Sequence, residues 1–455
     1  MKLKRRIERR KFLRDSASIV GGSSLLRDGF RSWGLERGGG LNAIEGRLTL
    51  SLNGEWEIED SVAADEIPQA FHHTVPVPGL AHLAKPDFPD VDMFEGREYI
   101  QNMVSYRQLP ESTLESLGED GVGISRQKRN SFWYRKTFRV QARKEVAILK
   151  NGKAQFGTAV WLNKKKIGEH LGWFTAAFFN LTEALNWEGE NTLLVRVGAH
   201  PGVLPKGALA GTDFEKAKWT PGIYDTVSLR LSDNPVIETL QVAPRIHSSE
   251  IEVQVVVRNY AQTTRRFAFS HRVKTWKGQE EVAQATPPQL ELQPGERGTW
   301  THKISIPAAT LWTPEDPFLY TLETSTGGDS FETRFGMREF RFDTATKRAY
   351  LNGKVYFLRG SNITLHRFFE DPKAGDLPWD ERWVRKLLID IPKQMHWNSF
   401  RFCIGPVPDR WLDIADEAGL LIQNEFFVWT GRPSWDRLHK GRRWDADEMI
   451  RQYKE

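Results

Sequence analysis

Asn398-Ser-Phe-Arg-Phe-Cys-Ile404 begins the stretch that decides the fold, and Pro408-Asp-Arg-Trp-Leu-Asp-Ile-Ala-Asp-Glu-Ala-Gly419 and Leu420-Leu-Ile-Gln-Asn-Glu-Phe426 complete it. The first piece is short and aromatic, which is typical of a strand. The middle piece has apolar residues at helical spacing between a proline and a glycine, so we predict a helix of a few turns. The last piece is an apolar run too short for a helix, as expected of a strand buried on both faces.

Strand, helix and strand with such short links predict a right-handed βαβ unit, in which the two strands are parallel. In a barrel built from such units, the chemistry lies on the rim where the strands end. Arg401 lies near the end of the first predicted strand, and Asn424 and Glu425 end the second. A cation, an amide and a carboxylate are therefore expected on one rim.

The size and charge of the chain limit its class. At 455 residues and 52.3 kDa it is too long for one core, and we expect roughly two to four domains. The sequence pI near 9.1 would favour a nucleic-acid binder, but residues 1–14 hold eight Lys and Arg against one acid. The rest of the chain is slightly acidic, so we predict no nucleic-acid partner.

The single cysteine, Cys403, excludes an intrachain disulfide, which fits folding in reducing cytoplasm. No apolar run approaches the length of a bilayer span, so no transmembrane segment is predicted. Glu8-Arg-Arg-Lys-Phe-Leu-Arg14 resembles the twin-arginine export signal, and a weakly apolar segment, Ala17–Leu26, follows it. We therefore predict a leader and linker at residues 1–45 and an exported bacterial protein, periplasmic or extracellular; a disordered basic tail is the alternative.

Two segments of short alternating strands follow the leader. Phe132–Val140, Thr158–Leu162 and Asn191–Val197 are strand candidates in residues 46–235, which predicts an antiparallel sandwich or jelly roll. In residues 236–340, Ile251-Glu-Val-Gln-Val-Val-Val257 alternates in the same way, which is typical of an immunoglobulin-like sandwich that acts as a spacer. His302 in that sandwich is expected to be packed rather than to bind a ligand.

Fragments of the first sandwich carry a family resemblance. Ser51-Leu-Asn-Gly-Glu-Trp56, Val77-Pro-Gly79, Val160-Trp-Leu-Asn163 and Trp219-Thr-Pro-Gly-Ile-Tyr-Asp-Thr-Val227 occur in a specific order and spacing. They resemble the sugar-binding domain of glycoside hydrolase family 2, the β-galactosidases, β-glucuronidases and β-mannosidases, and the resemblance covers nearly everything after residue 45. It implies a multidomain fold: a jelly-roll, galactose-binding-like β-sandwich at 46–235, an immunoglobulin-like sandwich at 236–340 and the start of a (β/α)8 TIM barrel at 341–455.

Residues 341–455 contain only part of such a barrel. Val355–Asn362 is predicted as its first strand after a hairpin turn at Tyr350–Lys354, and a helix from about Trp379 follows, which Pro392 breaks or kinks. A further helix starts at Asp445. The three predicted strands fall short of the roughly eight that a closed barrel takes. We therefore expect a truncated or split enzyme, with a separately encoded C-terminal barrel portion as a candidate partner.

The resemblance also implies where the chemistry should be. A retaining glycosidase uses an acid/base and a nucleophile, two carboxyls roughly 5 Å apart on either side of the scissile bond. In the family these sit on later strands, so we expect them beyond Glu455 and expect the chain to be inactive alone. Asn424-Glu425 imitates the family's acid/base dipeptide, but it follows Asp416–Ile422, which in the family leads to an earlier glutamate. A structural or substrate-side role is therefore predicted for Glu425.

Substrate contacts are predicted for six residues, namely Arg401, Glu425, Asn424, Asn362, His366 and Asn102. The rim residues could instead stabilise the barrel, and Asn102, in the long polar segment Lys85–Gln127, could be an ordinary surface residue. Where many family members have Ser-His-Tyr-Pro, this chain has Cys403-Ile-Gly-Pro406, and Ile363-Thr364 stands where a histidine is frequent. These departures leave the sugar open, and we predict neither a metal site nor a cofactor.

Together these features predict a retaining β-glycosidase that cleaves O-glycosidic bonds in carbohydrate metabolism, with a β-glycoside or oligosaccharide as its carbohydrate ligand. The alternative is a non-catalytic carbohydrate-binding or scaffold protein that keeps the two sandwiches.

Overall fold

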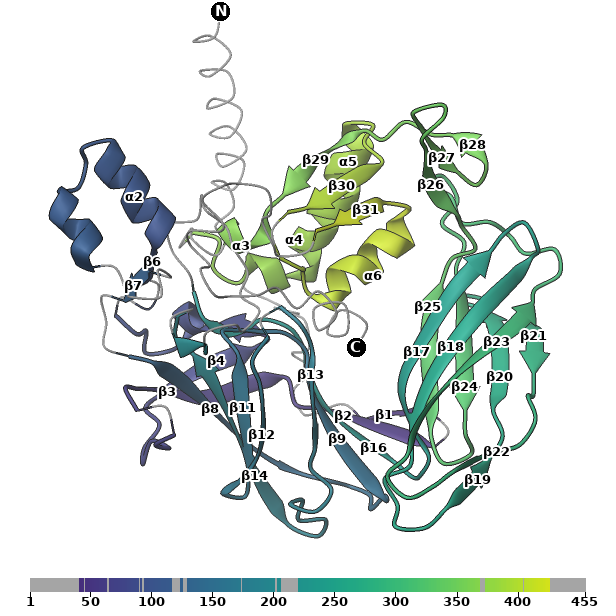
Figure 1. Ribbon diagram of the computed structural model, residues 1–455, viewed down its shortest axis with the longest axis horizontal. Coiled ribbons are helices and arrows are strands. Elements are labelled where there is room, and N and C mark those ends of the chain that lie inside the picture. The colour runs from purple at the N-terminus through teal and green to yellow at the C-terminus, as the bar shows by residue number, and fades with distance from the viewer. Residues whose placement is uncertain are drawn as a thin grey trace, which may run out of the picture.

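The computed structural model describes residues 41–44, 46–63, 65–89, 91, 94–116, 123–125, 129–172, 174–200, 203–205, 220–368, 373–403 and 405–425. They form two bodies of antiparallel sheet, with a smaller parallel sheet and its helices above and between them (Figure 1). The leader motif at Glu8–Arg14 and the helix predicted from Asp445 lie outside these residues. In this part of the chain, no helix is long and apolar enough to cross a membrane.

The first body is a sandwich whose two large sheets face each other across one core. One sheet has the order β1(Leu41–Ile44), β2(Arg47–Ser51), β16(Val227–Ser232), β9(Val146–Asn151), β13(Ala177–Asn180). The other has the order β12(Lys165–His170), β11(Thr158–Leu162), β14(Glu190–Gly198), β8(Ser131–Arg139), β3(Gly54–Ser61), β4(His73–Val77). A short third sheet joins β10(Ala154–Gln155), β15(Gly222–Ile223) and β5(Gly79–Leu80).

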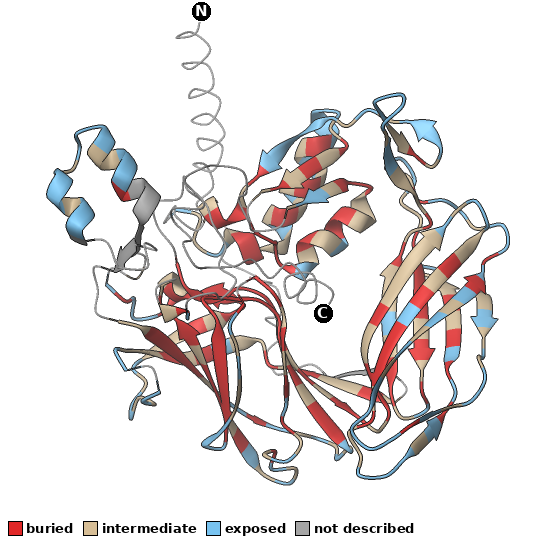
Figure 2. Ribbon diagram, viewed as in Figure 1, coloured by how far each residue is buried: buried red, intermediate tan, exposed pale blue. Residues whose placement is uncertain are grey.

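Alternating apolar residues fill this core, as the sequence pattern predicts. Trp56, Tyr134 and Val195 are at most 1% exposed, and the buried positions run in stripes along the strands (Figure 2). The predicted strands β8, β11 and β14 are confirmed. The expectation that residues 1–45 are all leader and linker is wrong at its end, because Leu41–Ile44 pairs with β2 along its whole length.

The segment Lys85–Gln127 is less irregular than its composition suggests. It contains β6(Phe94–Gly96), the helix α2(Arg97–Ser105), the 3-10 turn η2(Glu111–Ser116) and β7(Gly123–Ser125), and the 3-10 turn η1(Ala81–Leu83) precedes it. This long polar segment therefore contains regular structure, which its composition does not indicate. Among the residues of α2 whose exposure is described, 100–105, only Ile100 is buried.

The second body is a smaller sandwich. Its sheets have the orders β17(Val236–Arg245), β18(Glu250–Arg258), β23(Arg297–Ser305) and β21(Glu281–Ala285), β20(Ser270–Thr275), β24(Tyr320–Ser325), β25(Ser330–Phe335), with a two-stranded ribbon of β19(Arg265–Phe267) and β22(Leu290–Leu292). The alternation predicted in β18 is confirmed, because Ile251, Val253, Val255 and Val257 are fully buried while Gln254 is exposed.

A hairpin sheet leads from the second sandwich to the parallel sheet. It consists of β26(Phe340–Asp343), β27(Arg348–Leu351) and β28(Lys354–Val355). The turn predicted at Tyr350–Lys354 is confirmed, with positive φ at Asn352 and Gly353. The single strand predicted at Val355–Asn362 is wrong in its extent, because Val355 belongs to β28 and the parallel strand starts at Gly360.

The parallel sheet has the order β29(Gly360–Ile363), β30(Ser399–Phe402), β31(Leu421–Asn424). The helix α6(Asp409–Ala418) connects β30 to β31 and ends at Gly419, whose φ is +77°, so the βαβ unit predicted from the opening stretch is confirmed. β31 departs from its prediction: Leu421 is buried, but Gln423 and Asn424 are exposed, because polar side chains occupy the second half of this edge strand.

The predicted helix from Trp379 is divided into several segments. After α3(Leu365–Phe368) and the 3-10 turn η4(Leu377–Trp379), the chain continues through α4(Glu381–Arg385), the π-helical turn η5(Lys386–Asp390) and α5(Ile391–Gln394) without leaving helical geometry. The wider π turn directly precedes Pro392, which removes one N–H donor and crowds the preceding turn of a helix. Pro392 therefore disturbs the helix, as predicted, but does not end it.

One hydrophobic cluster joins the parallel sheet to the first sandwich. Phe402 and Trp411 from β30 and α6 pack in the same cluster as Leu80, Phe156 and Tyr224 from the first sandwich. Two indole hydrogen bonds reinforce it: Trp379 Nε1 donates to the carbonyl of Tyr224 at 2.8 Å, and Trp411 Nε1 donates to that of Pro378 at 2.9 Å. The rim of the parallel sheet is therefore fixed relative to the sandwich beneath it.

Candidate functional site

The carboxyl ends of β29, β30 and β31 form the candidate site, because parallel strands deliver their last residues to one edge. β29 aligns Asn362 with Arg401 of β30, and β30 aligns Phe402 with Asn424 of β31. Backbone hydrogen bonds continue the ladder past the strand ends, from Cys403 N to the Ile363 carbonyl at 2.8 Å and from Glu425 N to the Phe402 carbonyl at 3.1 Å.

The cation and the carboxylate predicted on this rim meet there. Arg401 Nη2 contacts Glu425 Oε1 directly, in a pair whose side chains are 40% and 21% exposed. A guanidinium paired with a carboxylate keeps further N–H donors, so this pair can offer both donors and acceptors to a polyol. The geometry suits the holding of a polar ligand.

The two asparagines predicted at the rim lie on the outer strands, on either side of β30, which carries Arg401. Asn362 and Asn424 are both exposed and end β29 and β31. The thiol of Cys403 is partly exposed on the middle strand and forms no disulfide. The described rim therefore carries Arg401, Glu425, Asn362 and Asn424 at one edge of the sheet, and the contact shown among them is that of Arg401 with Glu425.

His366 does not share this exposed rim. It lies in α3, 1% exposed, with its ring 4.6 Å from that of Phe174 and 5.4 Å from that of Tyr224, both in the first sandwich. Its Nε2 lies 3.4 Å from the carbonyl of Pro406. These contacts place His366 in the packing between the sandwich and the parallel sheet.

Asn102 lies apart from the rim. It sits on the exposed side of α2, and its carbonyl accepts hydrogen bonds from Ser105 Oγ at 2.7 Å and Tyr106 N at 2.9 Å. Figure 1 shows α2 well separated from β29, β30 and β31. The structure therefore does not bring Asn102 together with the other candidates.

The described part of the rim carries a single carboxylate. Among the described residues that directly follow the three strands, 364–368, 403, 405–408 and 425, only Glu425 is acidic. It is paired with Arg401 rather than facing a second carboxyl. Retaining hydrolysis needs two carboxyls roughly 5 Å apart, and that arrangement is not present in these residues.

An ion cluster at the start of α6 was not predicted. Lys153 Nζ contacts Asp225 Oδ2 at 2.5 Å and also contacts Asp409 at the start of α6. Burial opposes the charge on Lys153, but the two carboxylates raise its pKa, and Lys153 and Lys150 in turn hold the pKa of Asp409 below its usual range against partial burial. This cluster ties α6 to the first sandwich.

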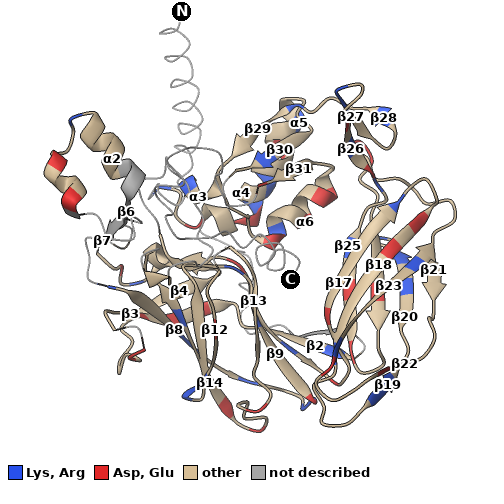
Figure 3. Ribbon diagram, viewed as in Figure 1, with Lys and Arg blue, Asp and Glu red and all other residues tan. Residues whose placement is uncertain are grey.

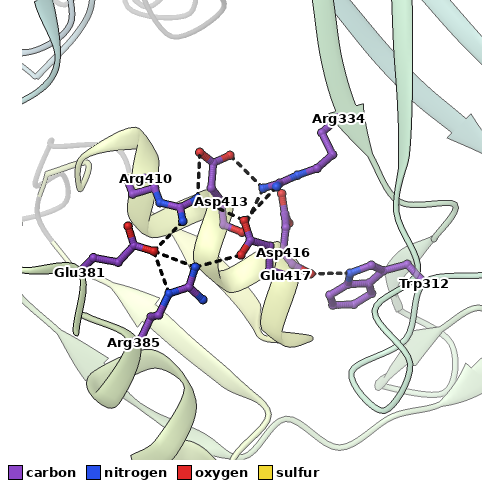
Figure 4. A network of polar contacts seen from close by, with 8 residues as sticks. All are labelled: Trp312, Arg334, Glu381, Arg385, Arg410, Asp413, Asp416 and Glu417. Carbon is purple, nitrogen blue, oxygen red and sulfur yellow. Dashed lines mark hydrogen bonds and ion pairs between the residues drawn. The ribbon is translucent and has the colours of Figure 1, made fainter. Parts of the chain in front are cut away.

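A second network ties α6 to the second sandwich (Figure 4). Arg334 of β25 donates to Glu417 and Asp413, at 3.0 Å each, and Trp312 Nε1 donates to the Asp416 carbonyl at 3.0 Å. Charges of both signs surround α4 and α6 in Figure 3. The network continues from Glu417 to α4, because Arg385 donates to both Glu417 and Glu381, and Arg410 also donates to Glu381.

The shifts in pKa around α6 agree with a structural role. Burial would raise the pKa of Glu417, but the hydrogen bond from Arg334 and the charge of Arg410 lower it. Hydrogen bonds from Arg410 and Arg385 likewise lower the pKa of Glu381. These carboxylates are held charged and fully paired, so they serve docking of the helix.

The described residues contain no group of three His, Cys, Asp or Glu side chains that could hold a metal ion. Two histidines of the second sandwich lie with their rings in contact, and His302 Nδ1 is 2.9 Å from His271 Nε2. His271 also contacts Thr324 Oγ1 at 2.8 Å, and burial lowers its pKa to about 4. Both histidines therefore belong to the packing of that sandwich.

Two family descriptions match the chain. "Glycosyl hydrolases family 2" matches residues 236–338, and "Beta-galactosidase second all-beta domain" matches residues 104–201. Curated relatives include a β-galactosidase of Thermoanaerobacter pseudethanolicus, 27% identical over 68% of this chain and 41% of its own length, and a putative β-glucuronidase of Formosa agariphila, 25% identical over 68% and 28%. The chain thus spans less than half the length of these relatives.

Solved structures agree at the level of the fold. A β-glucuronidase of Bacteroides uniformis superposes with a TM-score of 0.63 at 22% identity, over 90% of this chain and 46% of its own. A family 2 β-galacturonidase of Eisenbergiella tayi superposes with a TM-score of 0.64 at 19% identity, over 90% and 63%. The sandwiches and the parallel sheet therefore keep an arrangement that recurs in these enzymes.

Proposed function

On the premise that the chain belongs to glycoside hydrolase family 2, we propose that its protein hydrolyses β-glycosidic bonds of a carbohydrate with retention of configuration. The family matches in both sandwich regions carry this proposal, together with the superposition of 90% of the chain on a β-glucuronidase. In the reaction, one carboxylate forms a covalent glycosyl intermediate and a second carboxyl acts as acid and then as base.

Within this scheme, residues 46–235 are a jelly roll, residues 236–340 an immunoglobulin-like spacer, and residues from 341 onward the beginning of the (β/α)8 barrel. The parallel order β29-β30-β31 and the crossover helix α6 support the last assignment. A closed barrel takes about eight strands, so strands beyond these three would complete it, from the same or from a separately encoded polypeptide.

The rim formed by Arg401, Glu425, Asn362 and Asn424 is assigned to the substrate side of the site. Glu425 is engaged by Arg401. The acid pair is assigned to strands beyond the described ones.

The protein is proposed to be exported, because the twin-arginine motif precedes the domains. Replacing Arg9 and Arg10 by Lys should abolish export, as measured by fractionation; unchanged export would refute this assignment.

Catalysis is tested with a polypeptide that includes the coding sequence after Glu455. We expect turnover of a chromogenic β-glycoside, a product of retained configuration by NMR, and loss of turnover when a later strand-end glutamate is replaced by Gln. Inversion of configuration would contradict the proposal.

The second candidate is a non-catalytic carbohydrate-binding protein, which the single paired carboxylate on the described rim favours. A stop after Glu455, with a product that binds sugars in calorimetry and hydrolyses none, would support it instead.

A further inference from the structure

A basic pocket lies between the two sandwiches. It has a volume of about 320 Å³, and none of its lining residues belongs to the rim or to residues beyond 340. The first sandwich contributes Arg47 of β2 and Arg230 of β16, and the second contributes Arg258 of β18 and Arg297 of β23. Four guanidinium groups from four strands therefore surround one space.

Only two of these arginines have carboxylate partners among the described residues. Arg47 is bonded to Asp329 through two of its nitrogens, and Arg297 Nε donates to Glu238 Oε2 at 2.6 Å. Arg258 lies with its guanidinium 4.9 Å from the ring centre of Tyr260, and its Nε is buried without a hydrogen-bond acceptor among these residues. The pocket thus carries more cations than anions.

Arg230 is the most unusual of the four. Its guanidinium lies between two rings, 5.3 Å from that of Phe178 and 5.5 Å from that of Phe331, and no described carboxylate or carbonyl accepts a hydrogen bond from it. Burial, and then the nearby charge of Arg47, lower its pKa to about 10, although the charges of Asp329 and Asp409 act in the opposite direction. A partly buried cation that no described carboxylate hydrogen-bonds costs stability unless a ligand supplies the missing charge.

We propose that this pocket binds a small oxyanion, the sulfate, phosphate or carboxylate group of a free ion or of an acidic saccharide, with Arg230 and Arg258 as its principal donors. Planar guanidinium groups bind such anions through paired N–H donors, and weak hydration makes arginine suited to buried sites. The volume accommodates more than the anion alone, and the Phe178 and Tyr260 rings offer apolar walls. The site does not depend on the glycosidase proposal.

Binding is tested on the full 455-residue chain by thermal unfolding and calorimetry. Sodium sulfate, sodium phosphate and sodium glucuronate are compared with sodium chloride at matched ionic strength and with neutral glucose. We expect a saturable rise of the unfolding midpoint with at least one oxyanion and none with chloride or glucose. A response to the inorganic ions alone assigns the site to free anions, and a tighter response to glucuronate assigns it to an acidic sugar. No saturable response to any of the three would overturn the proposal.

Two variants separate binding from structure. Arg230→Met removes a partly buried charge that no described carboxylate hydrogen-bonds, at similar volume, so it should raise the midpoint of the ligand-free protein and weaken oxyanion binding about tenfold or more. Arg258→Gln should weaken oxyanion binding to a similar degree. The matched control is Arg266→Gln on β19, where the arginine is exposed and paired with Glu291 outside the pocket. A lower midpoint of Arg230→Met with wild-type affinity in both pocket variants would show that the arginines only support the fold.

Discussion

At the rim, the pairing of Arg401 with Glu425 is a contact between partly exposed groups, whereas Arg47 and Asp329 form a buried pair between the two sandwiches. The side chains of the first pair are 40% and 21% exposed, and those of the second 6% and 0%. Exposed pairs contribute about 0–1 kcal/mol, but breaking one partner of a buried pair costs about 3–5 kcal/mol. The two pairs should therefore respond very differently to the same substitution.

We expect Glu425→Gln to lower the free energy of unfolding by less than about 1 kcal/mol and Asp329→Asn to lower it by about 3–5 kcal/mol. Asp329 also accepts a hydrogen bond from Ile237 N at 2.7 Å, which strengthens the contrast. Chemical denaturation of the two variants and the wild type measures both values. Equal losses would show that the rim pair is held as rigidly as the buried one.

The fully buried His271 predicts a pH dependence of stability. Burial lowers its pKa from 6.5 to about 4, so the folded state resists a proton that the unfolded state accepts. The stability that neutral His271 contributes is present above the unfolded pKa and is lost as the pH falls from about 6.5 towards 4. The shift corresponds to about 3 kcal/mol.

The His271→Gln variant should therefore lose less stability than the wild type between pH 7 and pH 4, as followed by the unfolding midpoint at each pH. His247→Gln is the control, because that side chain is 79% exposed. If His271→Gln and His247→Gln showed the same acid dependence as the wild type, burial of the neutral imidazole would not be the cause.

Single residues were predictable where the local pattern determines them. Arg401, Asn424 and Glu425 were assigned to one rim because strand ends can be located from short apolar runs. The burial of His366 could not be predicted, because the sequence does not show that Phe174 and Tyr224 pack against it. The Lys153 cluster joins positions 72 and 256 residues apart, and no local pattern indicates such contacts.

At the scale of elements, Gly419 fixes how α6 ends and how the helix meets the second sandwich. Its φ is +77°, and a Cβ atom there would lie 2.2 Å from the carbonyl oxygen of Pro314. Gly353 has the same φ of +77° but open space where its Cβ would be. The two glycines share the left-handed backbone conformation and differ in the contact that an added Cβ would make.

Gly353→Ala should lower the free energy of unfolding by about 1 kcal/mol from the left-handed backbone alone. Gly419→Ala should cost more, because α6 or the Pro314 segment must also move. The difference between the free energies of unfolding of the two variants, measured by chemical denaturation, gives the cost of the contact with Pro314. A cost for Gly419→Ala no larger than that for Gly353→Ala would show that the helix end adapts freely.

Element types were more predictable than their limits. The strands β8, β11, β14 and β18 follow from alternation, and α6 follows from its proline and glycine boundaries. The strand predicted at Val355–Asn362 was too long because its first residue pairs with the hairpin instead, which depends on a tertiary partner. The helix α2 could not be located from the sequence, because it is a short element within a long polar segment.

At the scale of the whole molecule, α6 is the element on which both sandwiches converge. Lys153 reaches it from the first sandwich, and Arg334 reaches it from the second. An Arg334→Met substitution removes the bonds to Asp413 and Glu417 and should loosen this docking without unfolding either sandwich. Amide exchange of α6 should then quicken, while exchange in the buried strand β14 stays unchanged; equal acceleration in both would contradict this role.

The division into sandwiches and a parallel sheet follows from strand and helix patterns, and the family resemblance adds the order of the parts. The pocket between the sandwiches could not be predicted, because its four arginines come from separate strands with no common motif. The substrate sugar could not be predicted either, because arginine, glutamate and asparagine side chains can hydrogen-bond many different polyols.

The most direct test is the release of chromophore from a panel of β-galactoside, β-glucuronide and β-mannoside substrates by the purified 455-residue chain and its Glu425→Gln variant. Because the described rim holds one carboxylate, already paired with Arg401, we expect neither protein to exceed the uncatalysed rate. Turnover by the wild-type chain that disappears in Glu425→Gln would contradict the account, since Glu425 would then be a catalytic carboxylate.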